Sequence, residues 1–243
     1  MTHDYAQHYA RFHPDTPEHD ANLRALLRRW LEPHLPADRG IVILDVGCGR
    51  GYALAFLRDL GYTALTGVDS DPGQVEFARS RNLPVTLVEN TPELLRAHAA
   101  RYDLILLMDV LEHIPVAQQT EFLSAVTGAL RPGGKIIVTV PNASSPLGSY
   151  WRYVDLTHRI AFTIYSLHHA LTLAGLAVDR IESVEFIARP RFLFWLPTPR
   201  AMRWWLLCLM RGRWRLTYLA ELGWEQGWGT PLGPNLLAVA GRE

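Results

Sequence analysis

The stretch ILDVGCGRG, residues 43–51, decides the fold of this chain. A short apolar run leads to Asp45, and three glycines, Gly47, Gly49 and Gly51, follow at alternate positions before a pattern typical of a helix. Residues without a Cβ let a ligand approach the backbone closely and tolerate positive φ. The GxGxG spacing differs from the GxGxxG of dinucleotide sites, whose third glycine and helix N-terminus serve a pyrophosphate. The turn therefore favours a ligand without phosphates, although a glycine-rich turn alone can simply close a strand-to-helix junction.

Around this turn, short β-branched runs alternate with longer helical patterns, which is the rhythm of a parallel sheet covered by helices. Strands are predicted at residues 41–46, 64–69, 84–89, 103–109, 135–141, 176–187 and 235–242. Helices are predicted at residues 51–60, 72–81, 92–99, 118–130 and 166–175, with an irregular stretch at 142–160. The sequence thus predicts an α/β fold, a Rossmann-like, mostly parallel sheet of seven strands with helices on both faces.

The length and composition are typical of one domain. The chain has 243 residues, of which 49% are hydrophobic, and this is enough to bury one substantial core. We expect a single domain over residues 1–243, with an N-terminal arm and helix at 1–38, the core at 39–187, an insertion at 188–234 and the last strand at 235–243. The N-terminal helix itself is predicted at residues 21–35.

Charge and cysteine content exclude several classes of protein. Lys plus Arg and Asp plus Glu are balanced at 24 each, so no overall field attracts nucleic acid, and none is expected as a partner. The two cysteines, Cys48 and Cys208, lie far apart, which argues against a disulfide scaffold and against a zinc–thiolate site. The sequence shows no leader-like segment and no run of about 18 apolar residues. We therefore expect a cytoplasmic protein, with peripheral attachment at the inner membrane surface as the alternative.

Polar residues follow the predicted strands at one edge of the sheet. Asp69 ends the second strand, where a carboxylate can accept hydrogen bonds from both hydroxyls of a ribose. Ligands of open α/β sheets collect at the carboxyl ends of the strands, which brings Asn90 and Asp109 to the same crevice as the glycine turn. The sequence therefore predicts a ligand site formed by several neighbouring strand ends.

Four segments, ILDVGCGRG, GVDSD, DLILLMDVLEHI and LRPGGKIIVTVPN, resemble in this order the successive motifs of class I S-adenosylmethionine-dependent methyltransferases. The resemblance covers residues 41–175, and NLLAVAGR at 235–242 is similar to the last strand of that family. It implies that S-adenosylmethionine is the cofactor and that the chain transfers a methyl group. A dinucleotide-dependent oxidoreductase and a noncatalytic cofactor-binding or membrane-interaction module are the alternatives from other classes.

The resemblance also implies which residues surround the cofactor. The methionine part would lie against Asp45, Gly47, Cys48, Gly49 and Gly51, the ribose against Asp69, the adenine against Ser70, Glu89 and Asn90, and the sulfonium near Asp109 and Val110. The usual acidic residue after the third strand of the family is Asn90 here, which puts the contact with the adenine amine in doubt.

Two histidines follow the strands that border the predicted sulfonium position. His113 comes just after the fourth strand, and His158 lies in a polar loop after the fifth. Methyl transfer to a hydroxyl needs a base, and we predict that His158 is this base and that Asp155 orients its ring. The alternatives are that His158 forms a hydrogen bond to the substrate or has a structural role. His113 is a further candidate catalytic residue, with the alternative that its ring only packs under the loop.

Asp109, Glu112, His113 and His158 form an acidic-x-x-Glu-His pattern with a distant second histidine. This pattern resembles that of methyltransferases that bind a divalent cation near the acceptor, including the ubiquinone-biosynthesis O-methyltransferases. Two imidazoles and two carboxylates suit an octahedral ion that polarises an acceptor hydroxyl. A divalent cation is therefore a second expected ligand, although Glu-His at this place also occurs in family members without metal.

The segment PNASSPLGSYWRYVDLTHRIAFTIYSL, residues 141–167, resembles methyltransferases that modify bacterial polysaccharides and glycans. Tyr150, Trp151 and Tyr153 also offer aromatic faces beside polar groups, which suits sugar rings. We therefore expect O-methylation of a sugar or lipid-linked glycan, with a quinone or phenolic precursor as the alternative small-molecule acceptor.

The predicted insertion at 188–234 differs in composition from the rest of the chain. Between Arg189 and Pro234 lie six of the eight tryptophans, seven arginines and only two acids. A helix is predicted at residues 199–210, apolar nearly all round and edged by arginines, as helices at membrane interfaces are. The insertion is thus a lid or homodimer contact, a membrane-surface anchor or a nucleic-acid patch. The N-terminal arm, with Tyr5 and Tyr9, is expected to fold over the cofactor opening.

Overall fold

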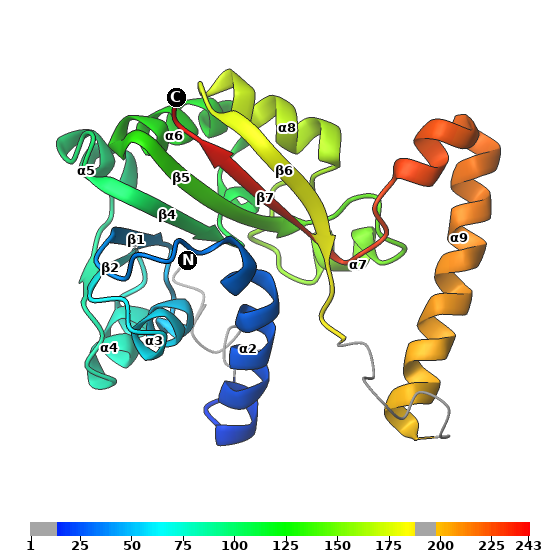
Figure 1. Cartoon of the computed structure of the whole chain (residues 1–243), viewed down its shortest axis with the longest axis horizontal. Helices are drawn as coiled ribbons and strands as arrows, with labels where there is room; N and C mark the ends of the chain where they lie inside the picture. The colour runs from blue at the N-terminus through cyan, green and yellow to red at the C-terminus, as the bar shows by residue number, and fades with distance from the viewer. Residues whose placement is uncertain (1–13, 188–197) are drawn as a thin grey trace.

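The computed structural model describes residues 14–187 and 198–243, and these form a seven-stranded sheet with helices on both of its faces (Figure 1). The strands are β1 (Val42–Val46), β2 (Ala64–Asp69), β3 (Val85–Leu87), β4 (Tyr102–Met108), β5 (Leu130–Pro141), β6 (Ala177–Val184) and β7 (Asn235–Gly241). Their order across the sheet is β3-β2-β1-β4-β5-β7-β6. The first five strands pair in parallel, and β7 runs antiparallel between β5 and β6. The predicted mostly parallel α/β sheet is confirmed.

Helices cover both faces because the strands are apolar on both faces. The helices are α2 (Pro17–Trp30), α3 (Tyr52–Asp59), α4 (Pro72–Ser80), α5 (Thr91–Ala97), α6 (Val116–Ala129), α7 (Gly148–Tyr153), α8 (Ile164–Leu173) and α9 (Pro199–Gly229), with 3-10 turns η1 (Glu32–His34) and η2 (Leu111–His113). Successive side chains of a strand point to opposite faces. Accordingly, Leu44 of β1 lies in one core with residues of α6 and α8, whereas Ile43 lies in another with residues of α2 and α3.

The N-terminal helix α2 has different bounds from those predicted. The side chain of Thr16 accepts a hydrogen bond from the N–H of His19 at 3.2 Å, and Pro17 occupies the first turn, so the helix begins four residues before the predicted start. It ends at Trp30 instead of residue 35, because Pro33 disfavours helical backbone in the residue before it and cannot donate a backbone hydrogen bond.

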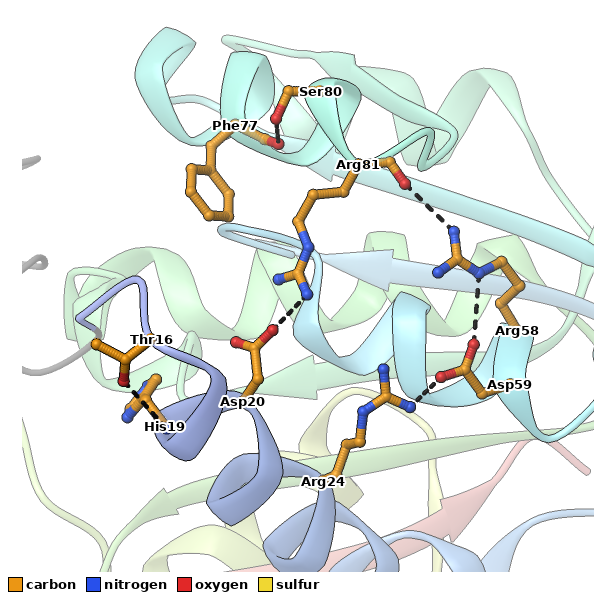
Figure 2. A network of polar contacts seen from close by, with 9 residues as sticks. All are labelled: Thr16, His19, Asp20, Arg24, Arg58, Asp59, Phe77, Ser80 and Arg81. Carbon is orange, nitrogen blue, oxygen red and sulfur yellow. Dashed lines mark hydrogen bonds and ion pairs between the residues drawn. The ribbon is translucent and has the colours of Figure 1, made fainter.

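Ion pairs tie α2 to the helices that follow the first two strands (Figure 2). Asp20 pairs with Arg81, which follows α4, and Arg24 pairs with Asp59 of α3. Arg58 of α3 donates a hydrogen bond to the carbonyl of Arg81 at 3.2 Å and lies 3.6 Å from Asp59. These contacts hold α2 beside the helix that begins directly after the glycine turn.

Three other segments differ from the prediction. The stretch at 142–160 contains α7, and β5 begins at Leu130, five residues before the predicted strand. The helix predicted to end at residue 210 continues to Gly229, with Gly212 inside it and Gly223 as the non-helical residue, at φ 77° and ψ 178°. A single glycine costs a helix only about 1 kcal/mol, so the helix-forming residues after Gly212 outweigh it.

The insertion lies between the last two strands of the chain, as the sequence predicts. α9 follows β6 and precedes β7, and it stands beside the sheet instead of covering one of its faces (Figure 1). Residues 1–13 and 188–197, which belong to the expected arm and insertion, lie outside the described residues. None of the helices within 14–187 and 198–243 has an apolar stretch long enough to cross a membrane.

Candidate active site

The three glycines of the turn after β1 have the positive φ that the sequence predicts. The φ angles are 66° at Gly47, 50° at Gly49 and 74° at Gly51. A Cβ at Gly47 would lie 2.6 Å from Cγ2 of Val110, and one at Gly51 would lie 2.5 Å from Cδ1 of Leu83. The first and third positions therefore require glycine for space as well as for backbone conformation. The contact of Gly47 also places the turn directly against the segment that follows β4.

Asp69, at the end of β2, holds the same turn. Its Oδ2 accepts a hydrogen bond from the N–H of Gly49 at 2.8 Å, and its Oδ1 accepts one from the N–H of Asp71 at 2.9 Å. Burial raises the pKa of Asp69, and the backbone N–H groups oppose this rise. A carboxylate oxygen can accept more than one hydrogen bond, so Asp69 can bind ligand hydroxyls while it holds the loop.

Asp45 is a buried carboxylate beside the glycine turn. The residue is 1% exposed, and its Oδ2 has no hydrogen-bond partner among residues 14–187 and 198–243. Burial, and then the charge of Asp69, raises the pKa of Asp45 to about 8. An unpartnered buried acceptor is costly, so this oxygen suits a ligand that brings N–H groups or positive charge. Cys48 in the same turn is a buried thiol whose pKa is also raised by burial, so it stays protonated.

The residues expected beside the adenine lie at the ends of β2 and β3. Ser70, Glu89 and Asn90 are all exposed. Asn90 caps α5, because its Oδ1 accepts a hydrogen bond from the N–H of Glu93 at 3.2 Å and its Nδ2 donates to the Glu93 carboxylate at 3.1 Å. The bond from Nδ2 gives a structural reason for an amide at the position where the family usually has an acid, because an Asp would cap the helix equally well but could not donate to the Glu93 carboxylate.

Asp109 joins three strands at the carboxyl edge of the sheet. It follows β4 with φ 55°, a left-handed conformation that is uncommon outside glycine and that clusters at functional sites. Its Oδ1 accepts hydrogen bonds from the Thr139 hydroxyl of β5 at 3.0 Å and from the Asn235 amide of β7 at 2.8 Å. These two bonds fix the carboxylate in the crevice, next to Val110 and the glycine turn.

His113 and His158 meet in the same crevice, beyond β4 and β5. Their ring centroids are 4.7 Å apart, with an interplanar angle of 72°. Burial, and then the charge of His158, lowers the pKa of His113 to about 4, so this ring is neutral near pH 7. His113 therefore offers a neutral imidazole to the crevice.

Hydrogen bonds determine which nitrogen of each ring carries the proton. Nδ1 of His158 lies 2.8 Å from the carbonyl oxygen of Trp151, which can only accept, so Nδ1 is protonated and Nε2 has the lone pair. The Thr157 hydroxyl donates to Oδ1 of Asp155 at 2.7 Å and therefore accepts from Nδ1 of His113 at 2.8 Å. The prediction that Asp155 orients His158 is thus corrected. The Trp151 carbonyl of α7 does so, and Asp155 acts on His113 through Thr157.

Glu112 forms a cluster with the two histidines. One ligand atom from each of Glu112, His113 and His158 lies within 4.8 Å of the others. Glu112 is fully buried, and neither of its carboxylate oxygens has a hydrogen-bond partner among the described residues. Burial, and then the charge of Asp109, raises the pKa of Glu112 well above its ordinary value. The fourth expected ligand, Asp109, is not part of this cluster, but one carboxylate and two imidazoles already form a donor set that divalent cations accept.

The aromatic residues expected beside the acceptor divide into two groups. The ring of Trp151 packs against Phe186, with ring centroids 5.2 Å apart, and so fastens α7 to the end of β6. Tyr150 and Tyr153 are exposed on α7, the helix whose Trp151 carbonyl contacts His158. The sequence indicated these rings, but it gave no signal for the Trp151 carbonyl or the Thr157 hydroxyl as partners of the histidines.

Comparison with known proteins identifies the family. A methyltransferase domain family model matches residues 19–181, which is more than half of the chain. A SAM-dependent methyltransferase from Archaeoglobus fulgidus has a TM-score of 0.70 at 20% identity and covers 98% of this chain and 100% of that chain. A putative methyltransferase from Haloferax volcanii, solved with a methyltransferase activator, has a TM-score of 0.63 at 18% identity, covering 98% and 95%. The chain belongs to the methyltransferase domain family and has the class I, S-adenosylmethionine-dependent methyltransferase fold.

Two curated relatives show which kind of methyltransferase the chain is similar to. The ubiquinone biosynthesis O-methyltransferase of Methylocella silvestris is 34% identical over 145 residues, which is 55% of this chain and 56% of the relative. That of Cereibacter sphaeroides is 32% identical over 133 residues, which is 51% of this chain and 52% of the relative. The chain thus spans about half the length of the curated relatives that it matches. S-adenosylmethionine is the cofactor that the family and the fold imply.

Proposed function

We propose that this chain is an S-adenosylmethionine-dependent O-methyltransferase that binds the cofactor against the glycine turn and an acceptor hydroxyl against the histidine pair. The contact of Gly47 with Val110 carries this proposal, because Val110 leads directly into η2 with Glu112 and His113. The turn that would bind the donor and the cluster that would receive the acceptor are therefore parts of one crevice. Proximity and orientation account for much of the rate of such a transfer.

The residues of the crevice fit the cofactor. When bound, S-adenosylmethionine supplies a methyl group on a positively charged sulfur, which is an excellent leaving group. The open Oδ2 of Asp45 would accept a hydrogen bond from the amino group, and Asp69 would bind the ribose hydroxyls. The methionine part would lie against the backbone of the glycine turn, and Ser70 and Glu89 lie where the adenine is expected. Asn90 is engaged in its helix cap and contributes less than the acid of other family members.

His158 is the proposed base. Its Nδ1–H is held by the Trp151 carbonyl, so Nε2 is the nitrogen that can accept the proton of the acceptor hydroxyl. The same carbonyl stabilises the imidazolium that forms, because a hydrogen bond to a charged donor is stronger than one to a neutral donor. His113 stays neutral beside it and orients the acceptor through its own Nε2.

A phenolic hydroxyl is the acceptor that we propose first. The curated relatives named above act, by their names, as O-methyltransferases in ubiquinone biosynthesis, and a histidine base beside neutral His113 suits a hydroxyl that loses its proton as the methyl group arrives. A sugar hydroxyl is the second candidate, favoured by the exposed faces of Tyr150 and Tyr153 on α7.

A divalent cation is the alternative to a histidine base: Glu112, His113 and His158 would hold it, and Nε2 of His158 would then be a ligand instead of the proton acceptor. The ion would polarise the acceptor oxygen and lower the pKa of its hydroxyl. The fit rests on the buried, unpartnered carboxylate of Glu112 and on the two imidazoles whose Nε2 atoms carry the lone pairs. The Nδ1–H partners of these rings match the outer hydrogen bonds that orient histidine ligands in metal sites.

Two measurements test the proposal. Calorimetry with S-adenosylhomocysteine is expected to show binding, whereas nicotinamide dinucleotides should give no heat, since the GxGxG turn lacks a pyrophosphate site. Transfer from radiolabelled S-adenosylmethionine to phenolic, sugar and amine acceptors then identifies the acceptor class. Label on a phenol and none on an amine is the expected pattern. Binding of the cofactor product without transfer to any hydroxyl acceptor would contradict the proposed reaction.

A further inference from the structure

α9 exposes a row of large apolar side chains. Met202, Leu206, Leu209 and Leu216 follow one another at intervals of three to seven residues, and each is 59% to 67% exposed. At 100° per residue these positions fall within one side of the helix. Scattered exposed leucines are ordinary, but a continuous apolar side of a long helix marks a surface that another layer covers. We call these four residues the apolar stripe.

The opposite side of α9 is fastened to the rest of the chain. Arg211 forms a bidentate ion pair with the carboxylate of Glu185, with both N–O distances at 2.6 Å. The hydroxyl of Tyr218 donates a hydrogen bond to the carbonyl of Ser144 at 3.0 Å. Residues 211 and 218 lie seven apart and so share a side of the helix, which is the side away from the apolar stripe. The apolar stripe therefore points away from the sheet.

The fastened side of α9 does not pack closely on the sheet along its whole length. A hollow of about 400 Å³ lies between α9 and the ends of β6 and β7, lined by Arg211 and Arg215 on one side and by Ser183 and Gly233 on the other. Figure 1 shows the helix beside the sheet and not on it. The four residues of the apolar stripe take no part in the contacts that fasten the helix and remain available for a partner.

The exposed charges of α9 are basic beside the apolar stripe. Arg203 and Arg213 are exposed, and the two acids of α9, Glu221 and Glu225, come only near Gly223 at its far end. Arg213 falls on the same side as Leu206 and Leu209. In a contact between two copies of the helix, its charge would be buried in the apolar centre with no acid nearby, which is unfavourable. At a lipid surface, its stem can lie among apolar groups while the guanidinium reaches lipid phosphates.

We propose that α9 is a membrane-surface helix that binds anionic lipid bilayers. The apolar stripe enters the boundary between headgroups and acyl chains, and Arg203 and Arg213 pair with the phosphates of the lipids. After Gly223, the exposed rings of Trp224 and Trp228 stack with centroids 5.7 Å apart. The ring of Trp228 lies 5.7 Å from the guanidinium carbon of Arg215, which is on the fastened side of the helix, so these two rings are not part of the apolar stripe.

Vesicle flotation tests this proposal with the full chain. We expect binding to phosphatidylcholine vesicles that contain phosphatidylglycerol, weaker binding as salt is raised, and little binding to phosphatidylcholine alone. The double substitution Leu206→Glu/Leu209→Glu should reduce the bound fraction about tenfold or more, since it removes two apolar side chains and adds negative charge. Leu173→Glu, at the exposed end of α8, is the matched control and should bind like the unchanged chain. S-adenosylhomocysteine calorimetry on each variant confirms that the crevice is intact.

Three outcomes would overturn the proposal. The first is that the unchanged chain does not float with anionic vesicles at low salt. The second is that the double variant floats as well as the Leu173→Glu control. The third is that light scattering shows a dimer without lipid which the double variant converts to a monomer, because the apolar stripe is then covered by a second copy. None of these results depends on methyl transfer, so they leave the proposed reaction to its own tests.

Discussion

Nδ1 of His158 lies 2.8 Å from the carbonyl oxygen of Trp151, seven residues earlier in the chain. Because a carbonyl cannot donate, this contact assigns the proton of the ring to Nδ1 and leaves Nε2 for chemistry. A short helix, α7, thus decides the protonation pattern of the proposed base.

Replacing His158 with alanine should lower turnover by about 10² to 10⁴, because it removes the proposed general base. S-adenosylhomocysteine affinity should change little, since the ring is not among the residues proposed to bind the cofactor. His169→Ala, on the exposed side of α8, is the matched control and should keep full turnover. Steady-state transfer of radiolabel measures both. Undiminished turnover of His158→Ala would remove this residue from the mechanism.

Asp45→Asn should make the cofactor-free chain more stable than the unchanged chain, by an amount that grows as pH rises. The same substitution should weaken cofactor binding. The pKa of Asp45 is about 8 in the folded chain and near its ordinary value of 3.8 when unfolded. The folded state therefore binds this proton more tightly, and the contribution of Asp45 to the unfolding free energy falls as pH rises from about 4 to 8. Asparagine does not titrate, so the variant should gain stability over the unchanged chain across that window.

Urea unfolding at several pH values, combined with S-adenosylhomocysteine calorimetry, checks both parts of this prediction. Affinity should fall by about tenfold or more, the effect of losing one charge-assisted hydrogen bond. Asp15→Asn, at an exposed position, should change neither quantity. A stability difference between Asp45→Asn and the unchanged chain that does not vary with pH would show that Asp45 has no raised pKa.

Gly47→Ala should destabilise the chain more than Gly61→Ala does. Both glycines have positive φ, at 66° and 92°, so alanine is strained by about 1 kcal/mol or more at either. Only at Gly47 does the new Cβ meet a neighbour, Cγ2 of Val110 at 2.6 Å, whereas nothing lies within 4 Å at Gly61. We expect the additional loss at Gly47 to be about 1–3 kcal/mol in urea unfolding.

The second substitution Val110→Ala tests the cause of that loss. In a double-mutant cycle, Gly47→Ala should cost less when Val110 is already alanine, because the clashing methyl group is gone. Strict additivity of the two substitutions would show that the turn and the segment after β4 are not in contact.

Removal of divalent cations should slow turnover if Glu112, His113 and His158 bind one. After chelator treatment, adding Mg²⁺, Mn²⁺ or Zn²⁺ in turn should raise the thermal unfolding midpoint with at least one of them, because a ligand that binds only the folded state stabilises it. The variant His113→Gln should lose this shift, and His169→Gln should keep it. Full turnover after chelation, together with no shift for any of the three ions, would contradict a metal site here.

The cofactor half of the site could be predicted from the sequence because its residues are close together in the chain. The glycine turn and Asp69 each end a strand, and parallel strands bring their carboxyl ends to one edge. The φ angles of the glycines follow from the same local pattern. The roles assigned to these residues in cofactor binding stay predictions.

The acceptor half depends on contacts between distant residues, for which a single sequence has no signal. Asn235 lies 126 residues from Asp109, its hydrogen-bond partner, and Thr157 lies 44 residues from His113. The end of α9 was missed for a different reason. Helix propensity after Gly212 outweighs the cost of one glycine, and a glycine in the sequence does not by itself show whether the helix ends there.

The position of β7 has a consequence for the order of assembly. This strand comes from residues 235–241, yet it pairs with β5 on one side and β6 on the other. During synthesis, β5 keeps an unpaired edge until that late segment leaves the ribosome, and exposed edges invite association with other chains. The hydrogen bond between Asn235 and Asp109 likewise cannot form before that segment is made. The crevice of the nascent protein is therefore complete only after β7 has joined the sheet, so a ligand present earlier would find an incomplete binding site.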